Sequence, residues 1–340
     1  MRVAIVGSTG AVGQELLELL AERSFPLTSV RLFASARSAG QERRFAGETL
    51  RVERLPEDGD LGVDIVFSSA GSSVSRACAW RWAEHGAVVI DNTSAWRLDP
   101  RVPLVVPEVN PGAVHEHQGV IANPNCSTII ALLALAPLHA AFGLRRATLA
   151  TYQAVSGAGQ AGIAELLEQT RVVLDGGRAR PNVFSHQIAF NLFSHDSAVG
   201  PDGYNHEETK LLLESRKILA APDLLLSATC VRVPVLRAHA EAIHAEFARR
   251  VVETEARTVL AGARGVRLVD DRESNTFPMP LEATGRDEVL VGRVRADASS
   301  PGGLALFVVG DQIRKGAALN AVQIAEILGG TSGLGARLKG

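Results

Sequence analysis

Four short, mainly apolar runs stand out in the first third of the chain, at 3–6, 30–34, 63–67 and 87–90, with Arg31 and Asp64 as their charged residues. Short runs that are almost entirely apolar are typical of strands in a parallel sheet that is covered on both faces. Between the first two runs, residues 11–22 place leucines on one face of a helical pattern. Because strand and helix patterns alternate, this region predicts a Rossmann-like, doubly wound α/β domain with a parallel sheet.

The pattern changes after about Asn123. A helical run at 127–142 is followed by longer strand candidates at 146–155, 224–235, 288–294 and 304–309, with few helices between them. This predicts an α+β domain with an open mixed sheet, interrupted by an irregular segment between 175 and 205. A last helical pattern, at 317–328, suits a return to the first domain. We therefore expect one domain from residues 1–125 and 316–340 and another from residues 126–315.

Composition and charge narrow the function classes. The chain has 340 residues, of which 46% are hydrophobic, and this is enough apolar material for substantial cores. Thirty-five Lys and Arg balance 37 Asp and Glu, which argues against a nucleic-acid or membrane-surface partner. No apolar stretch reaches about 18 residues, and the N-terminal run is too short for a signal peptide, so we expect a cytoplasmic protein. Neither the three cysteines nor the nine histidines show metal-site spacing, and no metal is expected.

A glycine-rich segment follows the first predicted strand and opens the first helix. Its spacing is GxxGxxG, starting at Gly7, instead of the common GxGxxG. The glycines permit a tight turn and a close approach of a pyrophosphate to the N–H groups of the helix N-terminus. The alternative is an ordinary strand-to-helix turn. The predicted cofactor contacts in this segment are Gly7, Thr9, Gly10, Ala11, Val12 and Gly13.

The end of the second predicted strand indicates which dinucleotide binds. An NAD site usually has an acidic residue there for the ribose 2′-hydroxyl. Here Ser35, Arg37 and Ser38 follow the strand, and no acid does. A guanidinium flanked by hydroxyl groups suits a 2′-phosphate, which a carboxylate would repel. The sequence favours NADP, with a solvated loop carrying an incidental arginine as the alternative.

Cys126 is the candidate nucleophile. It follows Asn123, Pro124 and Asn125 in a polar turn just before a predicted helix, and Pro124 disfavours helix for the residue before it. A helix N-terminus lowers the pKa of a thiol and supplies donors for an oxyanion. Most free cysteines are small buried hydrophobes, and the other two cysteines fit that description within a helix and a strand pattern.

His239 is the candidate general acid or base. It lies where we expect a long strand to end and a helix to begin, at the rim of a sheet where catalytic groups are common. His206, in a polar segment, is the main competitor, and either could be a histidine that faces water.

Several segments resemble aspartate-β-semialdehyde dehydrogenase, in the same order and nearly end to end. They are GSTGAVG, SARSAG, DNTSAWR, VPEVN, NPNCST, TYQAVSGAG, AFNLF, GYNHEETK, RVPVLRAHAE and KGAALNAVQIAEIL. The cysteine motif, the QAVSGAG segment and the spacing of seven from Arg232 to His239 are the most specific features. One detail departs from the common family pattern: Ala238 and Ala240 flank His239 where many members have Gly and Ser.

The resemblance implies the reversible NADP-dependent conversion of L-aspartate 4-semialdehyde and phosphate into L-4-aspartyl phosphate, in the biosynthesis of lysine, threonine, methionine and diaminopimelate. It implies that Cys126 forms a thioester, with His239 as general acid/base. It also implies further roles: Gln153 orients the substrate or a water, Arg232 and Glu207 bind the substrate, Arg97 and Lys210 bind phosphate, and Ser156, Gly157 and Asn320 lie near the cofactor. For Glu207 and Lys210 the alternative is a surface ion pair.

The family resemblance further implies a nucleotide-binding first domain and a catalytic second domain that pairs through its sheet. We therefore expect a homodimer or a dimer of dimers. Two alternatives share the architecture: N-acetyl-glutamyl-phosphate reductase and a non-catalytic NADP-binding paralogue. The first usually has Gly before its cysteine, where this chain has Asn125, and the second would lack the nucleophile or the base.

Overall fold

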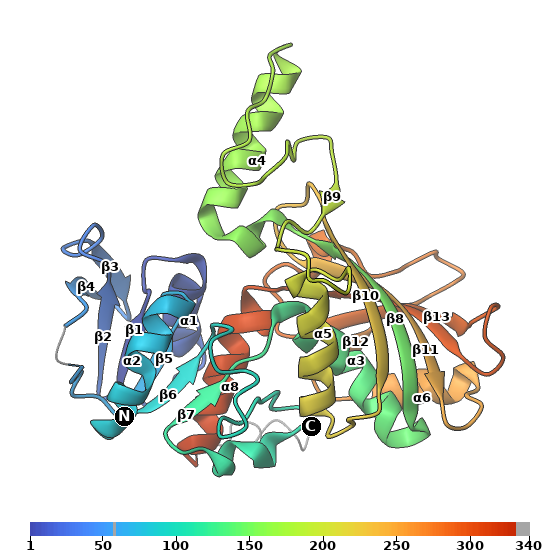
Figure 1. Ribbon diagram of the computed structural model, residues 1–340, viewed down its shortest axis with the longest axis horizontal. Coiled ribbons are helices and arrows are strands. Elements are labelled where there is room, and N and C mark those ends of the chain that lie inside the picture. Colours follow the sequence, from blue (N-terminus) through green and yellow to red (C-terminus); the bar gives the residue numbers. More distant parts are fainter. Residues whose placement is uncertain (57–58, 331–340) are drawn as a thin grey trace. The chain divides into compact units, whose positions relative to one another are not determined.

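A computed structural model describes residues 1–56 and 59–330 of the chain (Figure 1). The chain forms two compact units, Met1–Asn125 with Ala317–Gly340, and Cys126–Gly316. Residues 331–340, which the sequence assigns to the first domain, lie outside the described residues. Among the described residues, no helix is long and apolar enough to cross a membrane.

The first unit contains a seven-stranded sheet in the order β3-β4-β2-β1-β5-β6-β7. All neighbours are parallel except β3 and β4. The central strands match the four predicted runs, whereas β3 and β4 were not predicted, because their sequences are charged and largely exposed. The strands are β1 (Arg2–Val6), β2 (Ser29–Ala34), β3 (Glu42–Phe45), β4 (Glu48–Arg54), β5 (Ile65–Ser68), β6 (Val88–Asp91) and β7 (Val120–Ala122).

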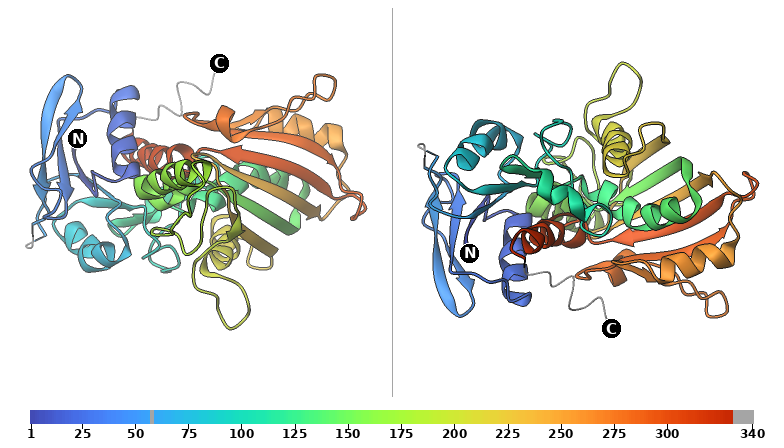
Figure 2. Two further views of the ribbon diagram at one scale, coloured as in Figure 1. Left: turned by 90° about the horizontal axis from the view of Figure 1, so that it is seen from above. Right: turned by 90° about the horizontal axis from the view of Figure 1, so that it is seen from below.

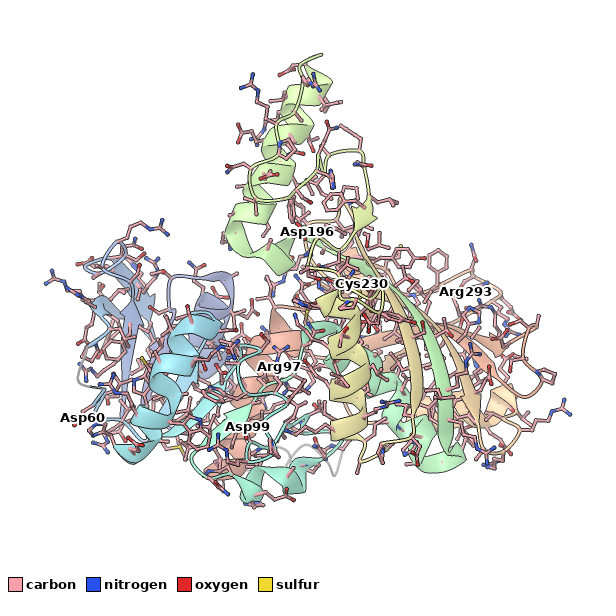
Figure 3. The ribbon with its side chains drawn as sticks, viewed as in Figure 1. Asp60, Arg97, Asp99, Asp196, Cys230 and Arg293 are labelled. Atoms are coloured by element: carbon pink, nitrogen blue, oxygen red, sulfur yellow. The ribbon has the colours of Figure 1, made fainter. Side chains whose placement is uncertain are left out.

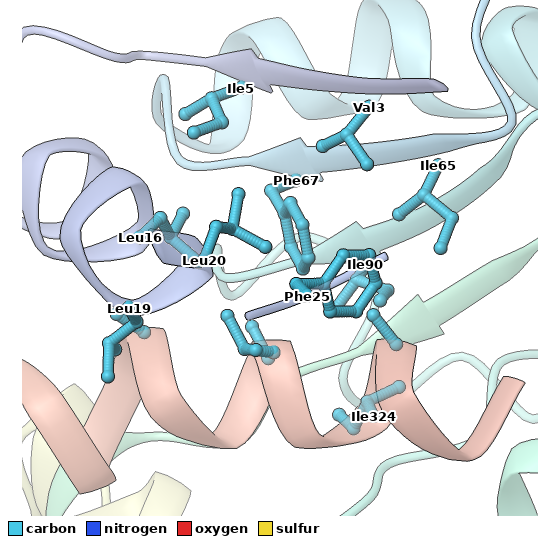
Figure 4. Packing of buried hydrophobic residues seen from close by; sticks show 14 of the residues in the cluster. Val3, Ile5, Leu16, Leu19, Leu20, Phe25, Ile65, Phe67, Ile90 and Ile324 are labelled. Carbon is cyan, nitrogen blue, oxygen red and sulfur yellow. The ribbon is translucent and has the colours of Figure 1, made fainter. Parts of the chain in front are cut away.

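Helices cover this sheet and complete its core. The leucines of α1 pack with Phe67 and with Ile324, which belongs to the last helix (Figure 4). Arg23 also pairs with Glu326 at 2.6 Å, and this links the end of α1 to the last helix. The last helix therefore belongs to the first unit, as its sequence suggested. The helices of this unit are α1 (Ala11–Glu22), α2 (Ser72–Glu84), the 3-10 turn Pro111–Glu116 and α8 (Leu319–Leu328).

The second unit contains a mixed seven-stranded sheet in the order β12-β13-β14-β11-β8-β10-β9, whose long strands are seen in Figure 2. β10 runs parallel to β8, and β11 runs antiparallel to both β8 and β14. The apolar helix α3 packs on four of the strands. The strands are β8 (Leu144–Gln153), β9 (Phe193–Ser194), β10 (Leu225–Arg232), β11 (His239–Phe247), β12 (Val266–Leu268), β13 (Val289–Ala296) and β14 (Leu304–Gly310).

Two expectations for the second unit were wrong. Helices are frequent between its strands, and α4 was missed although its leucines recur at helical spacing. His239 begins the strand β11 instead of a helix. The buried polar residues His239 and Glu241 fall on alternate positions of that strand, so the period of two was not visible as an apolar pattern. The helices are α3 (Cys126–Phe142), α4 (Gly159–Leu174), α5 (His206–Ile218), α6 (Glu253–Ala261) and α7 (Pro280–Ala283).

Candidate active site

Cys126 is the first residue of α3, as the turn at Pro124 predicted. Its side chain is half-buried, while Ser127 and Thr128 beside it are buried. Gly316 lies directly against it, because a Cβ at Gly316 would come within 2.9 Å of the Cys126 Cβ. Cys126 therefore lies at a helix N-terminus, and a side chain at position 316 would crowd it.

Gln153 ends β8 and is buried. Its side-chain nitrogen Nε2 donates to Ser127 Oγ at 3.1 Å, and it also lies 3.3 Å from both Thr151 Oγ1 and Glu207 Oε1. An amide nitrogen has two hydrogens for these three acceptors. Gln153 thus connects the residue after Cys126 with Glu207, within the second unit.

His239 is fully buried, and its Nδ1 accepts a hydrogen bond from the Ala154 N–H at 3.0 Å. This contact assigns the proton of the neutral ring to Nε2. Nε2 has no hydrogen-bond partner among the described residues. Burial, together with the charge of Arg232, lowers the pKa of His239 to about 3. The ring is therefore neutral at physiological pH and presents Nε2–H as a donor.

The backbone before His239 is unusual. Ala238 adopts a φ of +71°, which is a left-handed conformation that glycine tolerates best. Its N–H donates to Gln312 Oε1 at 2.8 Å, and this bond holds the conformation. Ala238, which departs from the common family pattern, thus keeps a backbone conformation suited to glycine. This conformation lowers the free energy of unfolding by about 1–2 kcal/mol.

Arg232 ends β10 and is 4% exposed. Its Nη1 donates to the carbonyl oxygen of Ala154 at 2.9 Å, so Ala154 contacts both Arg232 and His239. The guanidinium also lies 5.5 Å from the ring centroid of Phe184. A Cβ at Gly157 would come 2.9 Å from Nη1, so a side chain there would displace the Arg232 guanidinium from its observed position. The predicted cofactor role of Gly157 remains a prediction.

Glu207 and Lys210 lie on α5 and form an ion pair at 2.9 Å. The pair is not a surface pair of the usual kind, because Glu207 is 4% exposed and also contacts Gln153. The Glu207 N–H donates to Ser197 Oγ at 3.2 Å. In contrast, His206, which competed with His239 as the base, is exposed at the start of α5. The structure therefore favours His239 as the buried histidine next to Arg232.

Arg97, in the first unit, is buried and donates to two backbone carbonyl oxygens, those of Asn123 and Asn92. Asn320 is also buried, and its Nδ2 donates to Val105 O and to Asn123 Oδ1, the latter at 2.6 Å. Both side chains thus stabilise the segment that leads to Cys126. Their predicted contacts with phosphate and with the cofactor remain predictions.

The glycine-rich segment needs its glycines, and it leads into a helix without a side-chain cap. Gly7 has a φ of +90°, and a Cβ at Gly13 would come 2.3 Å from the Gly7 carbonyl oxygen. Gly10 is the N-cap of α1, and no side chain caps this helix. The first turn of α1 also carries no acidic residue. The N-terminal amides of α1 therefore face a position that suits an anion.

Ser35, Arg37 and Ser38 follow β2 in an exposed or half-exposed turn. Arg37 forms no ion pair among the described residues, and its guanidinium is accessible to a phosphate. Ser156, which was predicted near the cofactor, lies in the 3-10 turn Val155–Ala158 of the second unit, and its Oγ accepts a hydrogen bond from Gln312. The described residues contain no cluster of three or more potential metal ligands.

Sequence reasoning missed four other residues near this site. His195 contacts Arg232, but it lies in the segment expected to be irregular. Ala154 and Gly316 act through their backbone or their small size, and neither leaves a chemical signature. Glu241 is fully buried on β11 and points to the same face as His239, with no hydrogen-bond partner for either carboxyl oxygen among the described residues.

Comparison with known proteins identifies the family. The model of the semialdehyde dehydrogenase NAD binding domain matches residues 2–117, and that of the semialdehyde dehydrogenase dimerisation domain matches residues 135–315. The aspartate-semialdehyde dehydrogenase of Synechocystis sp. is 53% identical over 332 residues, which are 96% of this chain and 97% of that protein. The chain belongs to the aspartate-semialdehyde dehydrogenase family.

Solved structures agree with this assignment. Aspartate-semialdehyde dehydrogenase II from Vibrio cholerae has a TM-score of 0.93 and 48% identity, covering 96% of this chain and 98% of that chain. The same enzyme complexed with ASA has the same score and identity, with coverages of 96% and 97%. The Candida albicans enzyme, solved with NADP, has a TM-score of 0.73 and 26% identity, with coverages of 96% and 98%.

These findings confirm several predictions from the sequence. The fold class, the enzyme class and a place in amino-acid biosynthesis are those of aspartate-semialdehyde dehydrogenase. The matched domains also support a nicotinamide cofactor and a dimer. Neither N-acetyl-glutamyl-phosphate reductase nor a non-catalytic paralogue is favoured.

Proposed function

We propose that this protein catalyses the reversible, NADP-dependent conversion of L-aspartate 4-semialdehyde and phosphate into L-4-aspartyl phosphate. The observation that carries the proposal is the cluster of buried polar side chains in the second unit. His239 and Arg232 are joined through Ala154, and Gln153 joins Ser127, next to Cys126, to Glu207. Each of these side chains suits one part of an amino-acid aldehyde.

The cofactor proposal rests on the first unit. The uncapped N-terminus of α1 and the crowded glycines fit a pyrophosphate. The accessible Arg37 and the absence of an acid after β2 support NADP over NAD. When bound, the cofactor supplies a hydride acceptor in the oxidative direction.

Cys126 is proposed as the nucleophile. As a thiolate it adds to the aldehyde carbon, and the carbonyl oxygen becomes the oxyanion of a thiohemiacetal. The N-terminus of α3 favours the negative charge on sulfur. Loss of hydride from the carbon then gives the Cys126 thioester. Phosphate attacks the thioester carbon, the C–S bond breaks, and the thiolate is restored as the acyl phosphate leaves.

His239 is proposed to act at the oxygen of the reacting carbonyl. Its Nε2–H is a donor without a partner among the described residues, so it can bond to the oxyanion as charge develops there. The Ala154 N–H fixes the tautomer that makes this donor available. For the general acid/base role, Nε2 would have to take up the proton of the thiohemiacetal oxygen, and this requires the other tautomer, which the Ala154 N–H opposes.

The substrate-binding residues are assigned by matching their charges to those of the substrate groups. The guanidinium of Arg232 matches the α-carboxylate, and the buried carboxylate of Glu207 matches the ammonium group. Lys210 and Arg97 are the cations proposed for phosphate. Gln153 is proposed to orient the substrate or a water molecule near the sulfur.

We further propose that two copies pair through the face of the second sheet opposite α3. Tyr152 is 38% exposed on that face, and its ring lies 6.5 Å from that of Phe307. Light scattering at micromolar concentration should give the mass of a dimer, and Tyr152→Lys combined with Phe307→Glu should shift it toward a monomer. A tetrameric mass would indicate the dimer of dimers, and a monomeric wild type would contradict the proposal.

The covalent step can be tested without turnover. The enzyme should be mixed with L-aspartate 4-semialdehyde and NADP in the absence of phosphate, quenched in acid and analysed by intact mass spectrometry. We expect one added aspartyl group on the wild type, released by phosphate, and none on Cys126→Ala. An equal adduct on both proteins would contradict Cys126 as the nucleophile.

A further inference from the structure

A short loop touches both of the proposed substrate-binding residues. It lies between β9 and α5, and its Asp196 is labelled in Figure 3. Nε2 of His195 lies 3.0 Å from Nη2 of Arg232, and Ser197 Oγ accepts from the Glu207 N–H at 3.2 Å. The His195 N–H donates to the Cys230 carbonyl oxygen at 2.8 Å, which fixes the loop to β10.

The contact between His195 and Arg232 depends on the tautomer of the imidazole. A guanidinium can only donate, so Nε2 of His195 must be unprotonated to bond with it. The Ser197 N–H donates toward Nδ1 of the same ring, with the two nitrogens 3.2 Å apart, and competes for the lone pair of the ring. A neutral imidazole can accept at one nitrogen and a protonated imidazole at neither. The charged donor is the stronger one, so the lone pair is best used on Arg232.

Arg232 has donors left over for a ligand. Its Nη1 is bonded to Ala154 O, and its Nη2 faces His195. Its Nε is buried and has no hydrogen-bond partner among the described residues. A buried donor without an acceptor is costly, and a carboxylate that binds along the Nε edge of the guanidinium would satisfy it.

We propose that His195 is a positioning residue that, as a neutral imidazole, holds the guanidinium of Arg232 in the orientation that binds the substrate carboxylate. This inference rests on the proposed function, since it takes Arg232 as the carboxylate-binding residue. His195 itself need not touch the substrate.

The surrounding charges set the pH below which His195 is protonated and can no longer accept from Arg232. Burial lowers the pKa of His195 most strongly. Glu207 on α5 and Asp196 in the loop raise this pKa, whereas Arg232 on β10 and Lys210 on α5 lower it. His239 on β11 also faces the same site and is neutral. The net effect is a lowered pKa, so His195 is neutral at physiological pH. Its protonation at lower pH places a second donor and a second positive charge against Arg232.

Steady-state kinetics of two variants test the proposal. His195→Phe keeps a ring but has no acceptor, and we expect the KM for the semialdehyde to rise about tenfold with kcat changed less than threefold. His195→Gln offers an amide oxygen near the position of Nε2, and its KM should stay within threefold of the wild type. The wild-type KM should rise as pH falls below 6.5, while that of His195→Gln should not.

The matched control is His85→Gln, an exposed histidine after α2, which should leave both constants and the pH profile unchanged. An unchanged KM in His195→Phe would overturn the proposal. So would an equal loss of kcat in the Phe and Gln variants, which is the sign of a general structural role.

An activity-independent measurement separates this proposal from the proposed function. The imidazole of His195 should be titrated by NMR in the wild type and in Arg232→Leu. We expect the pKa of His195 to rise in the variant, because the facing positive charge is gone. An unchanged pKa would refute the pairing. If the pKa rises but the wild type does not oxidise the semialdehyde, the pairing stands and the proposed substrate is wrong.

Discussion

The backbone N–H of Ala154 donates to Nδ1 of His239 at 3.0 Å, and this one bond sets what the histidine can do. It leaves the ring proton on Nε2, so His239 meets the reacting oxygen as a donor. The carbonyl oxygen of the same residue accepts from Arg232 at 2.9 Å. The residue directly after β8 thus fixes both His239, the proposed donor to the reacting oxygen, and Arg232, the proposed carboxylate-binding group.

Two substitutions of His239 distinguish the roles of its two ring nitrogens. In His239→Asn, the side-chain oxygen can still accept from Ala154 N–H, but the Nε2–H donor is lost. We expect kcat/KM to fall by about 10²–10⁴ with a nearly unchanged melting temperature. His239→Phe removes both functions, and the unpaired Ala154 N–H should cost about 1–3 kcal/mol of stability in addition. Full activity in His239→Asn would contradict the assigned donor.

Replacement of Gly316 should lower kcat, although this glycine takes no part in the reaction. In Gly316→Ala the new methyl group would come 2.9 Å from the Cβ of Cys126. We expect kcat to fall at least tenfold, while NADP binding, measured by calorimetry, stays within threefold. Gly262→Ala is the matched control, because its nearest neighbour would be 3.7 Å away. Equal effects of the two substitutions would show that the contact with Cys126 does not matter.

Arg37 should decide the choice of dinucleotide. Removal of its charge in Arg37→Ala should weaken NADP binding about tenfold or more and leave NAD binding within twofold, because only NADP carries the 2′-phosphate. Binding is measured by calorimetry for each dinucleotide. Arg44→Ala, on the edge strand β3, is a control that also removes one arginine from the first unit. A wild-type ratio of NADP to NAD affinity near one would contradict the NADP proposal.

Glu241 makes the stability of the protein depend on pH. Burial raises the pKa of this carboxyl group well above its ordinary value of 4.5, and the neighbouring charge of Glu207 adds to the effect. Its contribution to stability is therefore complete below pH 4.5 and is lost as pH rises toward the raised pKa. The loss is about 1.4 kcal/mol per pH unit over that range.

Glu241→Gln keeps the shape of the protonated acid and cannot ionise. We expect it to melt at a higher temperature than the wild type at pH 8, with a smaller difference at pH 5. Glu246→Gln, at the exposed end of the same strand, should show no such growth with pH. If the gain for Glu241→Gln were the same at both pH values, the carboxyl group would not be held neutral.

The fold was predictable where burial leaves a simple pattern. The central parallel strands of the first unit are mainly apolar, and α1 has its leucines on one face, so both could be located closely. The edge strands β3 and β4 bury little and carry charged residues, so no pattern marks them. In the second unit, β11 buries His239 and Glu241, and polar residues on a buried face hide the period of a strand.

The candidate site could be predicted where a reactive side chain lies in a recognisable sequence motif. Cys126 stands out because a polar turn is an unusual place for a core cysteine, and its place at the start of α3 follows from Pro124. Glu207, Lys210 and Arg97 came from the family resemblance alone. Contacts made by a backbone group, as at Ala154, or by the lack of a side chain, as at Gly316, depend on tertiary packing and have no local signal.

The most direct test is the formation of NADPH from L-aspartate 4-semialdehyde and NADP, measured by absorbance with and without phosphate. The wild type should show sustained turnover only with phosphate, and Cys126→Ala should show none under either condition while still binding NADP. A wild type that binds NADP but forms no NADPH, or a Cys126→Ala variant that retains phosphate-dependent turnover, would contradict the account.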